Sequence, residues 1–181
     1  MRVPAVSALF LATQALAGTA VVLAGQTAIS GAVEVRLREL FPNAASFSPK
    51  SGNPPHFTAY GASTGDGVKP ISGYAFWTTE LDPLERGYDG PIQILVGIRP
   101  DGLLAGVVVG PHREPYGSFS VDSPAFANQF AGKDVRDPFK VGTDVDAISR
   151  ATISVTSATR AIRNSARRVA RQLLTPVEKP K

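Results

Sequence analysis

The 181-residue sequence contains no cysteine. Without thiols, the chain has no disulfide bond, no cysteine-ligated iron–sulfur cluster and no thiolate catalysis. Its two histidines, His56 and His112, lie far apart in the sequence and lack the paired spacing of zinc or copper sites, which argues against a metal centre. Redox chemistry in this chain would therefore depend on a bound organic cofactor.

Charge is scarce at the N-terminus, where Arg2 is the one charged residue before Glu34. A basic start, an apolar run and small residues near Ala24 are typical of an export signal, and the uncharged stretch is also long enough for a membrane anchor. We expect residues 1–28 to be a signal peptide or membrane anchor, with cleavage near Ala24 as the preferred interpretation. The rest of the chain then ends outside the cytoplasm, either soluble after cleavage or anchored to the membrane.

Hydrophobic periodicity predicts an α+β fold, in which a small antiparallel sheet with a central hairpin is flanked by N- and C-terminal helices. The hairpin is the clearest element: apolar residues alternate from Ile92 to Ile98, a turn with Pro100 and Gly102 follows, and Leu104 to Val109 returns. Helical spacing and caps predict helices over residues 29–40, 123–132 and about 157–174. Further strands are expected over residues 57–60 and 73–80.

One domain of ordinary length accounts for residues 29–175, and residues 176–181 are expected to be a disordered tail. The final helix carries arginines opposite its apolar stripe, and no acid occurs from Ala147 to Val177. This charge suits a phosphate, anionic lipid, an acidic partner or simply solvent. No nucleic-acid recognition motif is present.

The segment from Asp146 to Ser154 offers a hydroxyl, on Thr152, with the small Ala151 before it and an acid nearby. Two interpretations are open from these residues. A hydroxyl-rich run before a helix is typical of an N-cap. The same position also suits an attached phosphate, because a helix N-terminus presents unpaired N–H groups and partial positive charge.

The sequence resembles the FMN-binding domain of bacterial respiratory complexes, with its nearest likeness to the exported N-terminal domain of NosR-type proteins. In the flavin-attachment motif of this family, many members have glycine at the position of Arg150, although an arginine at this position is similar to what NosR-type domains have. Other ordered segments extend the resemblance over about residues 37–172. The segments that carry it are 40–44, 73–76, 90–107 and 112–115. In the flavin-attachment motif, the matching residues are Asp146, Ser149, Ala151, Thr152 and Ser154.

The resemblance implies that FMN is joined to Thr152 by a phosphodiester, through a magnesium-dependent flavin transferase that uses FAD and releases AMP. Asp146 would be recognised by the transferase or help to bind its metal. His112 would hydrogen-bond the flavin and Glu114 would order the loop around it, the alternative being a solvated turn. Aromatic stacking on the flavin, or packing within the protein, is expected of Trp77, Tyr116 and Phe119. The expected cofactor-binding residues are Thr152, Asp146, Ser149, Arg150, Ala151, Ser154, His112 and Glu114.

The function implied is that of an electron-transfer flavoprotein subunit rather than a stand-alone enzyme. It would pass electrons to a separate redox partner in the periplasm or at the membrane. The alternative is a binding or regulatory module that keeps the fold but holds flavin non-covalently or not at all. Modification of Thr152 distinguishes the two.

Overall fold

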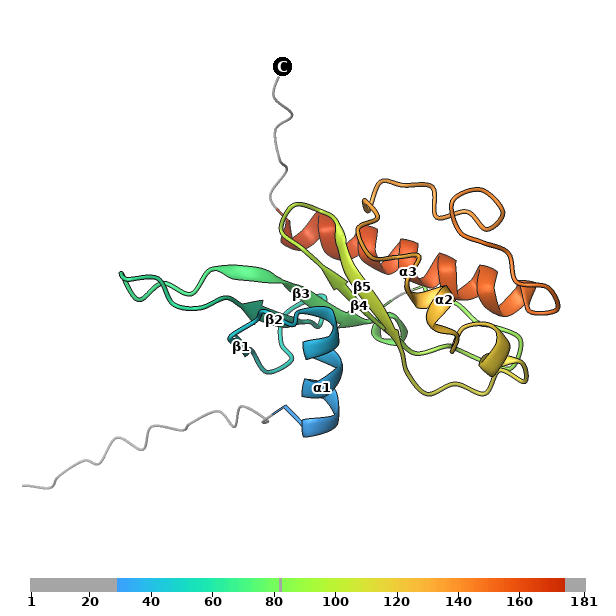
Figure 1. The fold of residues 1–181 in the computed structure, drawn as a ribbon, viewed down its shortest axis with the longest axis horizontal. Helices are drawn as coiled ribbons and strands as arrows, with labels where there is room; N and C mark the ends of the chain where they lie inside the picture. Colours follow the sequence, from blue (N-terminus) through green and yellow to red (C-terminus); the bar gives the residue numbers. More distant parts are fainter. Residues whose placement is uncertain (1–28, 82, 175–181) are drawn as a thin grey trace, which may run out of the picture.

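The computed structural model describes residues 29–81 and 83–174, which form a five-stranded antiparallel sheet with helices on both faces (Figure 1). The strands follow one another in sequence order, so each pairs with its neighbour along the chain. This arrangement confirms the predicted α+β fold. The principal elements are α1 (Gly31–Leu40), β1 (Ser46–Phe47), β2 (Phe57–Tyr60), β3 (Ile71–Trp77), β4 (Ile94–Ile98), β5 (Leu104–Val109), α2 (Pro124–Ala127) and α3 (Thr152–Leu173).

The β4–β5 hairpin lies where the sequence predicts it. Ile94 pairs with Val109 at its open end, and Ile98 pairs with Leu104 beside the turn. In the turn, Gly102 adopts a φ of 86°, a left-handed conformation that favours glycine. The Asp101 carboxylate accepts a hydrogen bond from the backbone N–H of Leu103 at 3.1 Å. Turn chemistry and strand alternation therefore agree on the register.

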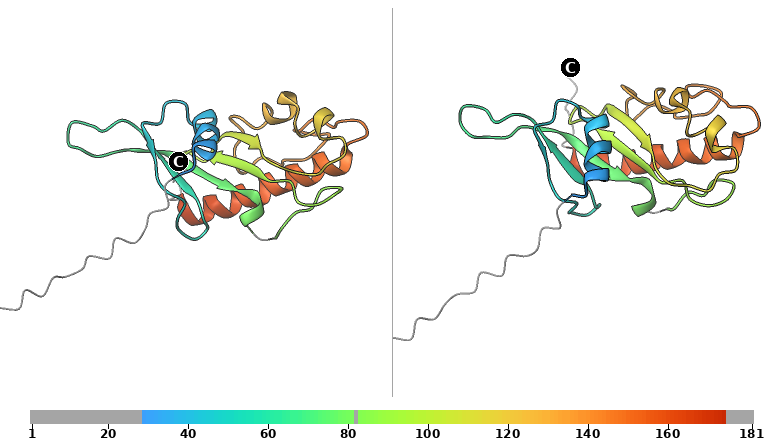
Figure 2. Two further views of the ribbon diagram at one scale, coloured as in Figure 1. Left: turned by 90° about the horizontal axis from the view of Figure 1, so that it is seen from below. Right: turned by 60° about the horizontal axis from the view of Figure 1, so that its bottom comes forward.

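Alternate residues of the strands build two separate cores, one on each face of the sheet. On β3, Phe76 packs in the core beneath α3, whereas Ala75 and Trp77 pack in the core beneath α1. Helix α1 contributes Leu37 and Leu40 to its core. Both views in Figure 2 show α1 and α3 on opposite sides of the sheet. The sheet is thus the middle layer of three.

Helix α3 begins at Thr152, and the prediction of a start near Ser157 is wrong. The Val155 N–H donates to the Ala151 carbonyl at 3.0 Å, which closes the first helical turn. Thr and Ser residues make up much of this first turn, and such residues usually favour helix caps over helix interiors. For this reason the sequence pattern did not predict that the helix begins at Thr152. Ser154 and Val155 are nevertheless buried, so the packed face of the helix continues to its N-terminus.

Two smaller predictions also need correction. Helix α2 covers only Pro124–Ala127, because the chain leaves the helix for turns before Gly132. Ser123 caps it as expected, accepting a hydrogen bond from the Ala125 N–H at 3.3 Å. Strand β3 ends at Trp77, and residues 78–80 form a short 3₁₀ turn.

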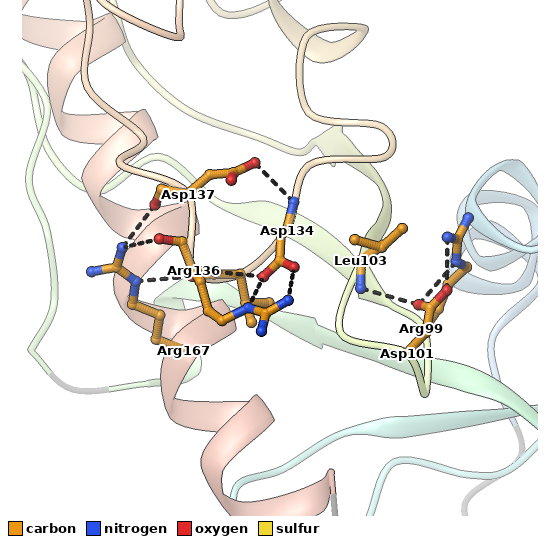
Figure 3. Close-up of polar contacts among 8 residues, drawn as sticks. Arg99, Asp101, Leu103, Asp134, Arg136, Asp137 and Arg167 are labelled. Carbon is orange, nitrogen blue, oxygen red and sulfur yellow. Dashed lines mark hydrogen bonds and ion pairs between the residues drawn. The ribbon is translucent and has the colours of Figure 1, made fainter. Parts of the chain in front are cut away.

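The long segment from 110 to 151 extends alongside α3 before it enters the N-terminal end of that helix (Figure 1). Arg167 of α3 ties part of this segment down, donating to the carbonyls of Val135 at 3.0 Å and Asp137 at 2.7 Å (Figure 3). Within the same loop, Asp134 pairs with Arg136. The segment that precedes α3 is therefore anchored to the helix it enters.

The signal peptide or anchor predicted for residues 1–28 and the tail predicted for residues 176–181 lie outside the described residues. Among the helices that are described, none combines the length and the apolar character needed to cross a membrane.

Candidate functional site at the N-terminus of helix α3

A groove of about 330 Å³ opens at the N-terminal end of α3. Thr152 and Ile153, on the first turn of the helix, are exposed there, and the Ile153 side chain is 58% accessible. Two exposed tyrosines, Tyr88 and Tyr116, add flat aromatic surface from two different loops. The lining residues are Tyr88, Pro115, Tyr116, Arg150, Ala151, Thr152, Ile153 and Ser154.

The end of α3 that faces this groove has no side-chain cap. Ala151 occupies the N-cap position, and its methyl group offers no acceptor to the N–H groups of the first turn. These groups and the aligned peptide dipoles give the end of the helix partial positive charge, which favours a phosphate. Thr152 is the first helical residue rather than the N-cap, so the capping interpretation of its hydroxyl is wrong.

The turn before the helix places Arg150 in a conformation that glycine usually adopts. The Ala151 N–H donates to the Ile148 carbonyl at 3.2 Å, which closes a four-residue turn. Arg150 is its third residue and has a φ of 67°, as a type II turn requires. This geometry gives a physical reason for the glycine that many related motifs have here. The arginine side chain is exposed and lines the groove.

Glu114 fastens the first turn of α3 to two loops. Its carboxylate accepts a hydrogen bond from the Ser154 hydroxyl, and it also accepts the backbone N–H groups of Tyr88 and Asp89, both at 3.0 Å. The residue is only 7% exposed. Gly87 makes the arrangement possible, because a Cβ there would lie 2.4 Å from the Glu114 carboxylate.

Burial by itself raises the pKa of the Glu114 carboxyl, since it disfavours the charged form. The hydrogen bond from Ser154 and those from the two backbone N–H groups oppose burial, with a further contribution from the His112 ring. Together they outweigh it and hold the pKa below its ordinary value of 4.5. The groove therefore rests on a buried carboxylate that is ionised at neutral pH.

His112 is engaged within the protein rather than directed at the groove. Its Nδ1 accepts the Glu114 N–H at 3.1 Å, so the ring proton is on Nε2, which lies 2.7 Å from an oxygen of Asp122. Gly117 leaves room for the ring, since a Cβ there would lie 2.3 Å from its Cε1 atom. His112 thus braces the 112–122 loop, and a direct hydrogen bond to flavin stays a prediction.

The other predicted residues fall into two groups. Ala151 is buried beneath the turn, whereas Asp146 and Ser149 are exposed before it and do not line the groove. The Asp146 N–H donates to the Gln129 side chain at 2.7 Å, which leaves the carboxylate at the surface. Trp77 is buried against α1 on the opposite face of the sheet, so it packs in the core and does not stack on a ligand here.

Tyr88 is the main contributor to the groove that sequence reasoning missed. It lies in a loop without regular structure, 28 positions from Tyr116 in the chain, and no local pattern links the two residues. Tertiary contacts bring that loop to the helix: the Glu114 carboxylate accepts the Tyr88 N–H, and Glu85 of the same loop pairs with Arg160 and accepts a hydrogen bond from Asn164 of α3. The glycine at position 87 was the available signal, because it marks a close approach of another group.

Comparison with known proteins identifies the segment that carries this site. Residues 87–167 match the FMN-binding domain family. This segment is an FMN-binding domain of that family. The match begins at the glycine that admits Glu114 and ends within α3, so every residue lining the groove lies inside it. No curated protein matches the chain.

The residues of the groove fit FMN on their own chemistry. An uncapped helix end and Arg150 suit the phosphate, while exposed tyrosine rings suit a flat ring system. The described residues contain no group of three or more side chains placed to hold a metal ion. The FMN-binding domain therefore offers a phosphate site and an aromatic surface side by side.

Proposed function

We propose that this FMN-binding domain carries its cofactor covalently, through a phosphodiester between the Thr152 hydroxyl and the phosphate of FMN, and works as an exported electron-transfer subunit. The observation that carries the proposal is the position of Thr152. Its side chain is exposed, lines the groove and lies in the first turn of an uncapped helix. When bound, FMN supplies the ability to accept electrons and pass them on.

Attachment requires a flavin transferase with FAD as the donor. The Thr152 oxygen forms a new bond to the phosphorus of the FMN half, the bond between the two phosphates of FAD breaks, and AMP leaves. The hydroxyl proton passes to a base of the transferase or to water. The exposed carboxylate of Asp146, six residues before Thr152 and without a partner among the described residues, is available for recognition by that enzyme.

Export and covalent retention support one another. A tethered cofactor cannot diffuse away, which suits a protein outside the cytoplasm, where free flavin is scarce. The uncharged N-terminal stretch supports export as a signal or an anchor. The sequence has no cysteine for an iron–sulfur cluster, so electrons would pass to a separate partner, in the periplasm or at the membrane.

The test compares Thr152→Val with wild-type protein, each produced together with a flavin transferase. Wild-type protein should keep its yellow colour after denaturation and gel filtration, and Thr152→Val should lose it. Thr156→Val is the matched control, because Thr156 lies one helical turn further along α3 and outside the groove. Thr159 is not a substitute site, since it is only 1% exposed.

Three outcomes separate the possibilities. Colour that survives denaturation only when Thr152 is present supports the phosphodiester. Colour that all three proteins lose on denaturation favours the alternative, a module that holds flavin non-covalently. Covalent flavin that persists in Thr152→Val would contradict the assignment of the attachment residue.

A further inference from the structure

The arginines around the groove differ from most others in the described chain, because no contact among the described residues engages their side chains. Figure 3 shows the usual situation: Arg99 pairs with Asp101, Arg136 pairs with Asp134, and Arg167 binds backbone carbonyls. Within residues 29–81 and 83–174, no hydrogen bond, ion pair or ring contact engages Arg86, Arg113 or Arg150.

These three arginines lie around one opening. Arg150 lines the FMN groove, and Arg86 and Arg113 line a neighbouring hollow of about 310 Å³. Tyr88 lines both, so the two hollows adjoin. Among the described residues that line them, Asp89 is the only acid. The mouth of the groove is therefore positively charged.

Exposed aromatic side chains occupy the same surface. Tyr88 is 69% exposed, Tyr116 is 54% exposed and Phe119 is 76% exposed. Phe119 does not line the groove, but its N–H donates to the Tyr116 carbonyl at 3.1 Å, which holds it in the adjoining turn. Exposed aromatic residues interspersed with arginine are the composition that protein–protein interfaces favour.

We infer that this groove rim, defined as Arg86, Tyr88, Arg113, Tyr116, Phe119 and Arg150, is the docking surface for an acidic partner protein. The inference rests on the proposed function in one respect: the docking partner is taken to be the protein that exchanges electrons with the FMN in the groove. Charge complementarity identifies the occupant: three guanidinium groups that form no ion pair with any described residue attract a surface rich in carboxylates. The aromatic side chains lose water when that surface covers them, which adds short-range affinity.

The experiment titrates the full chain with a plant-type ferredoxin, an acidic electron carrier, and with cytochrome c, a basic one. Binding is measured by calorimetry at low and high salt, with and without attached FMN. We expect ferredoxin to bind and cytochrome c not to bind. Added salt should weaken the ferredoxin complex, because screening reduces attraction between surface charges.

Charge-reversal variants locate the surface. Arg86→Glu/Arg113→Glu should weaken ferredoxin binding about tenfold or more at low salt. Arg171→Glu is the matched control, because Arg171 is also exposed and unpaired among the described residues but lies in the last turn of α3, outside both hollows. It should leave the affinity unchanged. Arg86→Gln/Arg113→Gln removes the positive charge without adding carboxylates, and it serves as the second variant if the charge-reversal variant folds poorly. It should also weaken ferredoxin binding, by a smaller factor.

Several results would overturn the inference. One is that ferredoxin does not bind, and another is that the rim variants and Arg171→Glu lose ferredoxin affinity equally. A third is that phosphate displaces ferredoxin at matched ionic strength, which would indicate a site for small anions. Failure here is distinguishable from failure of the proposed function. Covalent FMN is read from the colour and mass of the protein, whereas docking is measured on flavin-free protein as well.

Discussion

Glu114 is the residue on which the geometry of the groove most depends. Its buried carboxylate joins the first turn of α3 to the loop that carries Tyr88, and each of its bonds is donated by a different residue. Replacing a buried acceptor of this kind destabilises the fold, because its hydrogen-bond donors then have no acceptor and water does not readily reach them. Glu114 therefore positions the groove without needing to touch the cofactor.

The depressed pKa of Glu114 has a consequence for acid stability. A carboxyl whose pKa is lower in the folded state contributes stability above its unfolded pKa, and that contribution is lost as the pH falls through the folded pKa. The loss therefore begins as the pH drops below about 4.5, the ordinary value for this group. Once the pH lies well below the folded pKa, the stabilising contribution of Glu114 is lost completely.

Glu114→Gln should lower the free energy of unfolding by about 1–3 kcal/mol at neutral pH, since an amide group replaces one acceptor oxygen with a donor. Urea unfolding at neutral and acidic pH measures the effect, and the difference from wild type should shrink in acid. Glu39→Gln, an exposed acid on α1, is the control and should change little. A difference between Glu114→Gln and wild type that is the same at both pH values would contradict this role.

The turn that leads into α3 is the second determinant of the site, at the scale of an element. Arg150 adopts a positive φ, which β-branched residues tolerate poorly. Arg150→Val should therefore destabilise the protein by about 1–2 kcal/mol relative to Arg150→Gly in urea unfolding. Equal stabilities of the two variants would show that the turn does not impose this conformation.

Elements with a regular pattern were predictable from the sequence, and those set by tertiary contacts were not. Alternating residues and turn chemistry located the β4–β5 hairpin, and helical spacing located α1. The start of α3 escaped because Thr152, Ser154 and Ser157 resemble a cap, whereas burial of the two serines keeps them helical. Local preference yields to packing in such a turn.

The candidate site divides in the same way. The motif around Thr152 was visible in the sequence because its residues are consecutive. The role of Glu114 in ordering a loop was predicted from resemblance, but its partners, Ser154 and the backbone of Tyr88 and Asp89, are distant in the chain. The groove exists only once the fold brings these segments together.

At the scale of the whole molecule, the family match covers residues 87–167, yet the sheet extends well before it. Strands β3 and β4 pair directly, from Tyr74 with Ile98 to Trp77 with Leu95, so the matched segment shares a continuous sheet with the elements that precede it. We therefore predict that residues 29–174 unfold as one cooperative unit.

Leu37→Ala tests this prediction from the side away from the groove. Leu37 is fully buried beneath α1, and its truncation should cost about 3 kcal/mol. Trp77 fluorescence reports the core beneath α1, and far-ultraviolet circular dichroism reports all helices. The two urea transitions should coincide and shift together. An early fluorescence transition, with helix signal retained, would instead show that the α1 side unfolds separately.

The central claim concerns one hydroxyl, and mass spectrometry of protein produced with a flavin transferase tests it most directly. The account predicts an intact mass increased by one FMN phosphodiester, with the added mass on the peptide that contains Thr152. An unmodified mass under conditions in which the transferase is active on another substrate would contradict it, as would the addition on any other residue.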